Sequence, residues 1–345
     1  MMTYSEIIQN NCEKHSPVSW WPKFAFHYTD VTNAVSILSS GFLYSRTDAT
    51  NLHVMKNDNA SRQVIDMTNP DVVSRVRFYF RPLTPTQYYN EGYKHSKIRY
   101  DGDPNANTPV PIFFLFDLDK ILSLPNVSFS ETSQAGHGST LLSGADSFSK
   151  LNFDAIYSSG YENFDETKIY RHAEIVHSGS MEIAPYLNTI LCRNSIERIT
   201  LLNLLKEKDS LAYRKYCDRI KVYKKNTFEN NGLFVSDCLY HENIISISFS
   251  DFYAQKNYAR RMMERFEIDR LDPVEARIEI DWFNTRTHVS HSEIKSFVDY
   301  MNPKTINITN LPDYSKAGEI GVKVYLGEKL VCYVRQSLDS EEVIK

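Results

Sequence analysis

Two residues in the sequence have a type and a setting that could do chemistry on a charged substrate. Glu174 lies in a strand-like stretch among apolar neighbours, where a carboxylate is costly to bury unless something binds it. His27 stands at the end of an aromatic, strand-like segment. Taken singly, both are ambiguous, because a lone histidine is more often a core or surface residue and Glu174 could merely pair with Arg171 or Lys168. Their joint placement on strands makes them candidates for one site.

Several familiar catalytic motifs are absent from the sequence. It contains no glycine-rich phosphate loop, no H-E-x-x-H and no G-x-S-x-G. His288 and His291 have no third metal ligand near them, so a solvated pair is favoured and no metal site is expected. The five cysteines are scattered without a C-x-x-C pair, which favours reduced thiols in a cytosolic protein.

Length and charge limit the function further. The 345 residues favour about two domains of mixed α/β structure. The formal net charge of −4 excludes a globally basic protein, so any contact with nucleic acid must come from a local patch. No apolar run approaches the roughly 18 residues of a membrane span, and Met1–Ser19 lacks the apolar stretch of a signal peptide. We therefore expect a cytoplasmic protein without contact to a membrane.

The elements that would position the two candidate residues are short strands with a clear helix among them. Asp30 or Thr32 can cap this helix, and Gly41 suits its C-terminal end. Residues 45–75 are polar and predict a loop with a helical turn over the site. Pro111–Asp117 is a continuous apolar run, typical of a strand buried on both faces. Further strands are predicted at residues 20–30, 42–44, 76–80, 168–176 and 219–223.

The character of the chain changes after about residue 236. Residues 251–270 predict a helix with a basic face, although a solvated helix explains such charges more simply. Alternating stretches beyond residue 270 predict a small β-rich module. We therefore expect three parts: a first domain over residues 1–235, a basic helical extension over residues 236–270 and a small β-rich accessory module over residues 271–345.

Five short motifs follow one another between residues 20 and 225, over about two thirds of the chain. They are Phe26-His27-Tyr28-Thr29 with Asn33, Ile37-Leu38 and Gly41-Phe42-Leu43; Phe78-Tyr79-Phe80 with Pro82, Pro85 and Tyr88; Phe129-Ser130-Glu131; Leu151-Asn152-Phe153-Asp154-Ala155-Ile156; and Arg171-His172-Ala173-Glu174. Any one motif is weak, but the ordered series resembles the DarT family, the nucleic-acid ADP-ribosyltransferase toxins of bacterial toxin–antitoxin systems. The last motif is similar to the R-x-A-E strand of that family.

The resemblance implies an α+β fold, the ADP-ribosyltransferase fold, with a mixed, split β-sheet core and flanking helices, to which the C-terminal β-rich module is added. It also implies NAD⁺ as a substrate and no metal. Glu174 would be the catalytic carboxylate, which stabilises positive charge on the ribose and helps to remove a proton from the attacking base. The residues implied to bind NAD⁺ are His27, on the adenosine ribose, with Thr29, Asn33, Arg46, and Tyr28, Tyr79 or Phe80, on nicotinamide.

A cation is expected against the pyrophosphate or the transition state. Arg62 matches the loop arginine of the family and is assigned this catalytic role, with Arg46 as the alternative and a plain surface arginine left open. The aromatic and basic stretch over residues 88–99 could bind nucleic acid by stacking on an unpaired base and by attracting phosphates, although a solvated loop explains it equally well. The residues assigned to nucleic acid are Thr86, Tyr88, Tyr89, Lys94, Lys97 and Arg99.

We expect a toxin that attaches ADP-ribose to a base of single-stranded DNA, in a toxin–antitoxin or phage-defence system. Leu83 and Thr86-Gln87 depart from the common residues of the family near the substrate end, so guanine, adenine and thymine all stay open. RNA is the nearest alternative acceptor. A protein side chain as acceptor, or an inactive nucleic-acid-binding module, is a further alternative. The expected protein partner is an antitoxin, either a macrodomain-type hydrolase or a direct binder.

Overall fold

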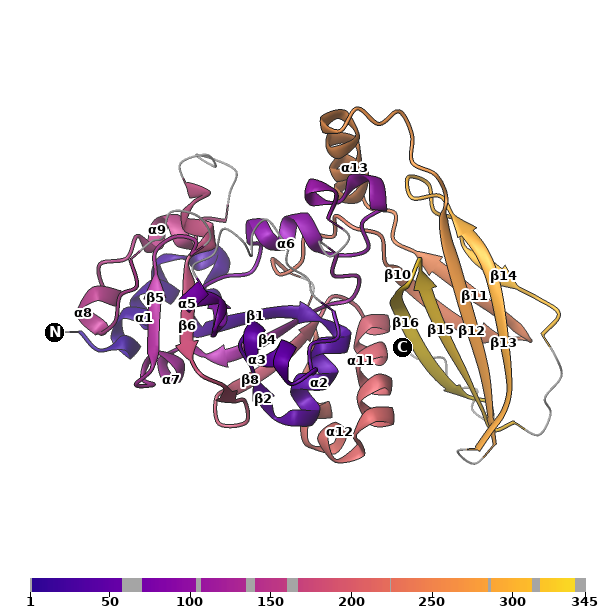
Figure 1. Cartoon of the computed structure of the whole chain (residues 1–345), viewed down its shortest axis with the longest axis horizontal. Coiled ribbons are helices and arrows are strands. Elements are labelled where there is room, and N and C mark those ends of the chain that lie inside the picture. The colour runs from indigo at the N-terminus through magenta and orange to yellow at the C-terminus, as the bar shows by residue number, and fades with distance from the viewer. Residues whose placement is uncertain are drawn as a thin grey trace.

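The computed structural model describes residues 2–57, 70–103, 107–134, 140–159, 167–223, 225–284, 287–311 and 317–338. Within these residues an N-terminal part and a C-terminal module stand side by side, each around its own hydrophobic core (Figure 1). We use the name C-terminal module for the described residues between 235 and 338. No helix in the described part of the chain is long and apolar enough to cross a membrane.

A seven-stranded sheet, counted over the described residues, forms the centre of the N-terminal part in the order β5-β6-β3-β1-β4-β8-β9. Its strands pair antiparallel except β8 with β9. The apolar run of β4 is buried between β1 and β8, as its sequence predicts. The strands are β1 (Phe24–Asp30), β3 (Arg75–Tyr79), β4 (Pro111–Asp117), β5 (Val127–Ser130), β6 (Glu174–Ser178), β8 (Leu187–Cys192) and β9 (Ile220–Val222), and a separate pair joins β2 (Phe42–Leu43) to β7 (Met181–Glu182).

Local capping signals set the ends of the predicted helix after β1. The Asp30 side chain accepts a hydrogen bond from the Thr32 backbone at 3.0 Å, and the helix ends at Gly41 with φ of 76°. The α-helices of this part are α1 (Tyr4–Lys14), α2 (Val31–Ser40), α3 (Arg46–Asn51), α5 (Pro70–Val73), α6 (Pro85–Asn90), α7 (Leu118–Leu122), α8 (Ala145–Phe148), α9 (Phe153–Ile156), α11 (Ser195–Lys208) and α12 (Ser210–Tyr216). The 3₁₀ turns are η1 (Ser16–Val18), η2 (Trp21–Lys23), η3 (Ser96–Ile98), η4 (Tyr100–Gly102), η5 (Tyr170–His172) and η6 (Cys217–Arg219).

Two predicted strands begin later than expected. Residues 21–23 form η2, so the first strand starts at Phe24. Residues 170–172 form η5, closed by a 3.0 Å hydrogen bond from the Ala173 backbone to the Tyr170 carbonyl. The strand therefore starts at Glu174, where pairing with β3 and β5 begins. The shorter strand places this carboxylate at the very end of a sheet ladder.

The C-terminal module consists of two antiparallel sheets and one helix. One sheet has the order β10-β11-β14 and the other the order β13-β12-β15-β16. Their apolar faces form the second core, while the polar residues of β12 alternate toward the outside. The elements are β10 (Val235–His241), β11 (Ile244–Phe249), α13 (Tyr253–Arg265), β12 (Val274–Asn284), β13 (Thr287–Val298), β14 (Ile306–Ile308), β15 (Glu319–Leu326) and β16 (Lys329–Ser337).

The expectation of a helical extension over residues 236–270 is wrong for its first half. β10 and β11 form a hairpin there, and β14 adds to its edge. Strand β11 alternates buried and more exposed residues with period two, a pattern that the sequence prediction missed beside the basic residues of the following helix. The module therefore begins near residue 235, and α13 belongs to it.

The two parts are joined by backbone contact. Tyr93 and Leu233 exchange hydrogen bonds of 2.8 and 3.0 Å between their backbones. A side chain at Gly232 would place its Cβ 2.7 Å from the Cα of Gly92, so the two segments can approach this closely only as glycines. Tyr93 and Ile98 also belong to the core of the C-terminal module. The junction is therefore a packed interface rather than a loose linker.

Candidate active site

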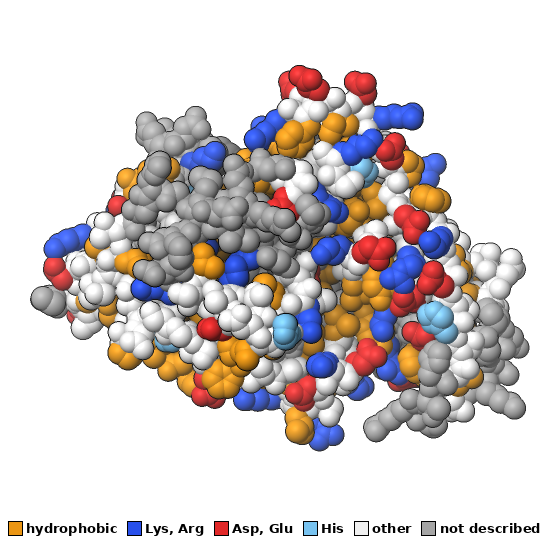
Figure 2. Space-filling view, in the orientation of Figure 1, with side chains coloured by type: hydrophobic (Ala, Val, Ile, Leu, Met, Phe, Trp, Pro, Cys, Tyr) orange, Lys and Arg blue, Asp and Glu red, His pale blue; other side chains and the backbone are white. Residues whose placement is uncertain are grey.

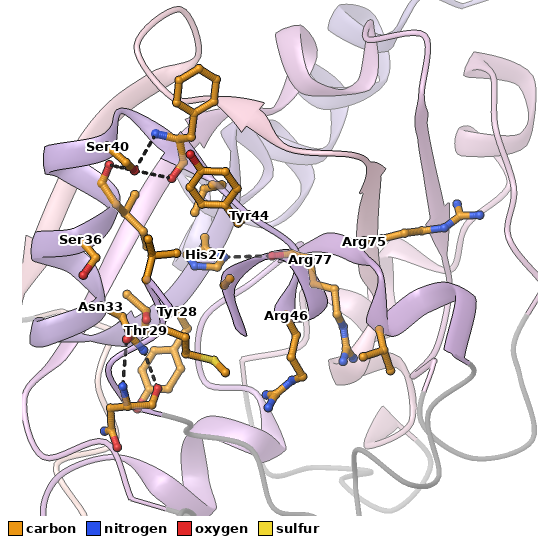
Figure 3. A pocket seen from close by; sticks show the side chains of 18 of the residues that line it. His27, Tyr28, Thr29, Asn33, Ser36, Ser40, Tyr44, Arg46, Arg75 and Arg77 are labelled. Atoms are coloured by element: carbon orange, nitrogen blue, oxygen red, sulfur yellow. Dashed lines mark hydrogen bonds between the residues drawn. The ribbon is translucent and has the colours of Figure 1, made fainter. Parts of the chain in front are cut away.

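A cavity of about 230 Å³ opens beside the central sheet of the N-terminal part (Figure 3). Its walls come from the end of β1, the length of α2, the strand β2, the helix α3 with the segment after it, the strand β3 and the helix α6. Ligand pockets in proteins usually hold about 300–1,000 Å³, so this cavity suits part of a dinucleotide. The predicted residues that line it are His27, Tyr28, Thr29, Asn33, Arg46, Tyr79 and Thr86.

Glu174 lies behind the wall of this cavity and is not one of its lining residues, and it is held by Arg77, which does line the cavity. Arg77 donates from Nε to Oε2 at 2.9 Å and from Nη2 to Oε1 at 2.6 Å. Glu174 pairs directly with Tyr79 across β3 and β6, and Arg77 lies two residues earlier on the same face. The long arginine side chain therefore reaches the carboxylate diagonally. The side chain of Glu174 is 1% exposed and that of Arg77 is 29% exposed, so Arg77 and Tyr79 form the cavity wall in front of the carboxylate.

The ion pair favours the charged form of Arg77. Burial by itself lowers the pKa of Arg77, but the Glu174 carboxylate outweighs it, and the pKa is raised above its ordinary value. A carboxylate offers about four acceptor sites, of which the bidentate contact uses two. Two acceptor sites remain, but Arg77 and Tyr79 separate them from the cavity, because the Glu174 side chain is 1% exposed. The sequence prediction did not include Arg77, although the alternation of Arg75, Arg77 and Tyr79 on one strand face was a usable signal.

His27 is fixed by the backbone of the same strand. Its Nδ1 atom lies 3.1 Å from the Arg77 carbonyl oxygen (Figure 3). Because a carbonyl oxygen can only accept, Nδ1 carries the proton and donates. Burial lowers the pKa of His27, and the hydrogen bond to Arg77 opposes this change. The neutral ring then has Nε2 as an acceptor, which is the partner that a ribose hydroxyl requires.

Three arginines of the described part of the chain line the cavity. Arg46 and Arg77 extend to the same side in Figure 3, whereas Arg75 points away from them. Arg46 and Arg77 thus place two cations on one side of the cavity. The sequence prediction named Arg46 and missed Arg77, and the contact of Arg46 with phosphate stays a prediction. Arg62, to which the sequence assigned the catalytic role, lies outside the described residues.

The neighbouring rings Tyr79 and Phe80 face opposite sides of the sheet. Tyr79 lines the cavity, and burial followed by the Glu174 charge raises its pKa, against a hydrogen bond with Thr86. Phe80 is 0% exposed and stacks on Phe148 in the core at 6.0 Å between ring centroids. The prediction that Phe80 contacts NAD⁺ is wrong, because successive side chains alternate between the faces of a strand.

Asn33 lines the cavity but also ties down its rim. Its Nδ2 donates to the Asn57 carbonyl at 2.6 Å, and its Oδ1 accepts from the backbones of Lys56 and Asn57 at 2.8 and 3.0 Å. The Asn33 amide thus holds the segment after α3, residues 52–57, against the first turn of α2. The helix α3 is a helical turn of the kind that the sequence predicts within residues 45–75, of which residues 58–69 lie outside the described part of the chain.

Lys94 does not lie on a nucleic-acid surface. Its ammonium is buried, donates to the Asn231 carbonyl and Oδ1 at 2.7 Å each, and lies 3.7 Å from the ring centroid of Tyr258. Burial lowers its pKa well below the ordinary value, although Glu91 and Glu229 oppose the change. The prediction that Lys94 binds nucleic acid is therefore wrong, because the segment folds into the junction instead of facing solvent.

The rest of the aromatic and basic stretch is also engaged with neighbouring residues. Tyr88 packs against Tyr258, and Tyr89 against Tyr100. Lys97 is paired with Asp272 at 2.7 Å, and Arg99 donates to the Lys94 carbonyl at 3.1 Å. These contacts stabilise the junction, and the role of these four residues in binding nucleic acid stays a prediction.

The visible face of the C-terminal module carries charges of both signs. Figure 2 shows Lys and Arg beside Asp and Glu there, without a region of one sign. Ion pairs within the module also join opposite charges, as between Lys295 and Glu275 at 3.2 Å and between Arg277 and Glu279. This face therefore offers no continuous positive groove for a phosphate backbone.

Comparison with known proteins identifies a family. A family model described as ssDNA thymidine ADP-ribosyltransferase, DarT, matches residues 26–220, more than half of the chain. The chain resembles the solved structure of Thermus sp. 2.9 DarT in complex with NAD⁺, with 15% identity, 60% of this chain and 98% of that chain covered, and a TM-score of 0.44. The same protein in complex with ADP-ribosylated ssDNA gives 15% identity, 60% and 97% coverage and a TM-score of 0.46. Thermosipho africanus DarTG in complex with ADP-ribose gives 13% identity, 64% and 54% coverage and a TM-score of 0.43.

No curated protein matches the chain. At such low identities the solved structures resemble it in fold alone, and the assignment depends on the family match. The matched residues contain His27, Tyr79 and Glu174, so the resemblance seen in the ordered motifs is confirmed. The chain belongs to the DarT family of single-stranded-DNA ADP-ribosyltransferases, enzymes for which NAD⁺ is the ADP-ribose donor.

Proposed function

We propose that Glu174 is the carboxylate with which this DarT-family enzyme transfers ADP-ribose from NAD⁺ to thymidine in single-stranded DNA. The observation that carries the proposal is the buried Glu174 directly behind the cavity wall, bound through both oxygens by Arg77, which lines the cavity. A buried carboxylate with its own counter-charge and a cavity beside it is typical of a catalytic site. Thymidine is the acceptor that the family description names.

The reaction requires negative charge beside the ribose. When the bond between C1′ and the nicotinamide nitrogen breaks, nicotinamide leaves with the electron pair and positive charge develops on the sugar. Glu174, oriented by Arg77, stabilises that charge and accepts a hydrogen bond from a ribose hydroxyl. The base then forms a bond to C1′ and loses its proton to a general base, for which Glu174 is the group at hand.

The other cavity residues support binding of the dinucleotide. The Nε2 atom of His27 accepts from a ribose hydroxyl, and Tyr79 or Tyr28 provides a ring for nicotinamide. Arg46 and Arg77 extend toward one side of the cavity, where they can neutralise phosphate oxygens. Thr86 lines the same cavity and hydrogen-bonds Tyr79, which supports a role for it beside the acceptor base.

The biological setting of the enzyme is part of the same proposal. An enzyme that modifies single-stranded DNA acts as a toxin in the cytoplasm, where both DNA and NAD⁺ are present. Such a toxin requires a protein that neutralises it, either a hydrolase that removes ADP-ribose or a direct binder. The similarity to Thermosipho africanus DarTG supports a toxin–antitoxin arrangement.

The test is transfer from labelled NAD⁺ to single-stranded oligonucleotides, followed by mass spectrometry of the nucleosides. The set contains DNA with thymidine, the same DNA with every thymidine replaced, and RNA of matched sequence. We expect modified thymidine in the first oligonucleotide alone. Glu174→Gln is expected to lower the rate by at least about 10²-fold, the range for loss of a general base or an electrostatic stabiliser.

Glu182→Gln is the matched control, because Glu182 is an exposed glutamate on β7 outside the cavity wall. Full transfer by Glu174→Gln would remove this residue from the mechanism. Modification of RNA in place of DNA would favour the RNA alternative. A wild-type protein that folds but transfers to none of the oligonucleotides would indicate an inactive binding module.

A further inference from the structure

A hairpin of the C-terminal module reaches the rim of the cavity. β15 and β16 are joined by a two-residue turn, and Leu326 pairs with Lys329 across it. Gly327 takes the positive φ of 54° that such a turn requires, and its backbone donates to the Glu275 carbonyl at 2.9 Å. Lys329, the first residue of β16, is therefore held at the tip of a rigid hairpin.

The ammonium of Lys329 binds a residue of the cavity wall. Its Nζ donates to Oδ1 of Asn57 at 2.5 Å, across 272 positions of the sequence. Asn57 is buried, lines the cavity and donates to the Asn107 carbonyl at 3.4 Å. The backbone of Asn57 is held on its other side by Asn33, another cavity residue. Asn57 thus joins α2, the segment after α3 and the C-terminal module.

A second residue near the cavity, although not one of its lining residues, also interacts with the charge of Lys329. Asp30 ends β1 directly after His27, Tyr28 and Thr29, and it caps the helix α2. Burial raises the pKa of Asp30, while hydrogen bonds from Thr32 and the positive charge of Lys329 oppose the change. The same ammonium therefore faces both the segment after α3 and the junction of β1 with α2.

The hairpin cannot easily swing away from the cavity. Besides the close approach of Gly92 and Gly232, the Tyr333 backbone of β16 donates to Thr200 Oγ1 at 2.9 Å, and Asn203 Nδ2 donates to the Tyr333 carbonyl at 3.1 Å. Thr200 and Asn203 belong to α11, which lies between the central sheet and β16 in Figure 1. β16 is therefore anchored to the N-terminal part along its length.

We propose that the C-terminal module completes the NAD⁺ pocket, with Lys329 as a positioning residue that fixes Asn57 and through it the cavity rim. This proposal rests on the proposed function, since it assigns NAD⁺ to the cavity. Lys329 does not touch the reacting atoms. Its loss is therefore expected to weaken the binding of NAD⁺ and to leave the chemical step unchanged.

The test compares Lys329→Met with wild type in the full-length chain. Methionine keeps the length of the side chain and removes the ammonium. We expect KM for NAD⁺ and the calorimetric Kd for NAD⁺ to rise about tenfold, with kcat within about twofold of wild type, because a charged hydrogen bond to a buried group is lost. Lys329→Arg keeps the charge and is expected to restore most of the affinity. Glu328→Gln, an exposed neighbour in the same turn, is the matched control.

A double variant shows whether Lys329 acts through Asn57. If it does, Lys329→Met adds little to the effect of Asn57→Ala on the Kd, because the contact is already lost. Additive effects, a fall in kcat with unchanged KM, or a Lys329→Met protein that differs from Glu328→Gln only in unfolding temperature would each overturn the proposal. If Lys329→Met does not fold, Lys329→Gln replaces it in the same comparison.

The two proposals fail in different ways. A folded wild-type protein that does not bind NAD⁺ overturns the proposed function and this inference with it. A wild type that binds and transfers normally, with all Lys329 variants equal to Glu328→Gln, overturns the role of Lys329 alone.

Discussion

The guanidinium of Arg77 and the carboxylate of Glu174 form a bidentate ion pair between β3 and β6, with contacts of 2.9 and 2.6 Å. Arg77 lines the cavity and separates it from Glu174, which is 1% exposed and lies behind the wall. Orientation of the carboxylate and its compensation by a positive charge therefore depend on one residue.

Arg77→Met is expected to destabilise the protein and to abolish transfer. The change leaves Glu174 buried without its cation, which costs about 3–5 kcal/mol. Arg77→Lys keeps a positive charge but loses the planar guanidinium that makes two hydrogen bonds. Its free energy of unfolding should therefore lie between those of wild type and Arg77→Met. Denaturant unfolding measures these differences. The double variant Arg77→Met/Glu174→Gln should regain much of the loss, and an Arg77→Met protein as stable as wild type would show that the pair is not structurally important.

Tyr79 and Phe80 form a matched pair of adjacent aromatic residues with opposite expected effects. Phe80→Ala opens a cavity in the core and should lower the free energy of unfolding by about 3–5 kcal/mol, with the KM for NAD⁺ of the folded protein unchanged. Tyr79→Ala should leave stability nearly intact but weaken NAD⁺ binding about tenfold, whereas Tyr79→Phe keeps the ring and most of the affinity. Calorimetric binding and denaturant unfolding on all three variants check this. The reverse pattern would mean that Phe80, and not Tyr79, faces the substrate.

The Lys94→Met variant tests whether Lys94 is a buried structural residue or a residue that binds phosphate. Because the Lys94 ammonium bonds Asn231 inside the junction, its loss should cost about 1–3 kcal/mol of stability. The affinity for single-stranded DNA and its dependence on salt should stay at the wild-type values. A residue that contacts phosphate would instead reduce the slope of log K against log salt by about one. A reduced slope for Lys94→Met would restore its predicted role at the nucleic acid.

Glu197 makes stability depend on pH. Glu197 and Glu91 share the buried guanidinium of Arg193, so one cation faces two carboxylates. Burial raises the pKa of Glu197 from 4.5 to about 7, although Arg193 opposes the change. An acid whose pKa is raised by folding contributes stability below its unfolded pKa and loses it as the pH rises through the folded value.

The Glu197→Gln variant stays neutral at every pH. As the pH rises from 4.5 to about 7, the free energy of unfolding of wild type should therefore fall relative to that of the variant, by up to about 3 kcal/mol. Above about pH 7 the difference between the two proteins should be constant. Denaturant unfolding at a series of pH values measures the difference. The variant also loses the contact with Arg193, which changes its free energy of unfolding by the same amount at every pH and does not alter the pH dependence. A difference that is the same at every pH would mean that Glu197 titrates as an ordinary carboxylate.

Local sequence was enough for elements that depend on neighbouring residues. The apolar run of β4, the Asp30 cap and the Gly41 end of α2 follow from periodicity and capping, which act within a few residues. Local sequence failed at residues 170–172, which form a 3₁₀ turn, and at residues 236–249, where a strand pattern stood beside a conspicuous basic helix.

For the site, the sequence by itself determined the candidate residues His27, Tyr79 and Glu174, through an ordered series of motifs that identifies the family. Only the tertiary structure decided that Arg77 binds Glu174, that Lys94 is buried and that Lys329 reaches Asn57. Each of these contacts joins residues far apart in the chain, 97 positions for Arg77 and Glu174, 137 for Lys94 and Asn231, and 272 for Lys329 and Asn57. Periodicity and capping report only on neighbours within a few residues, whereas the partner of a charged side chain depends on how distant strands and hairpins pack.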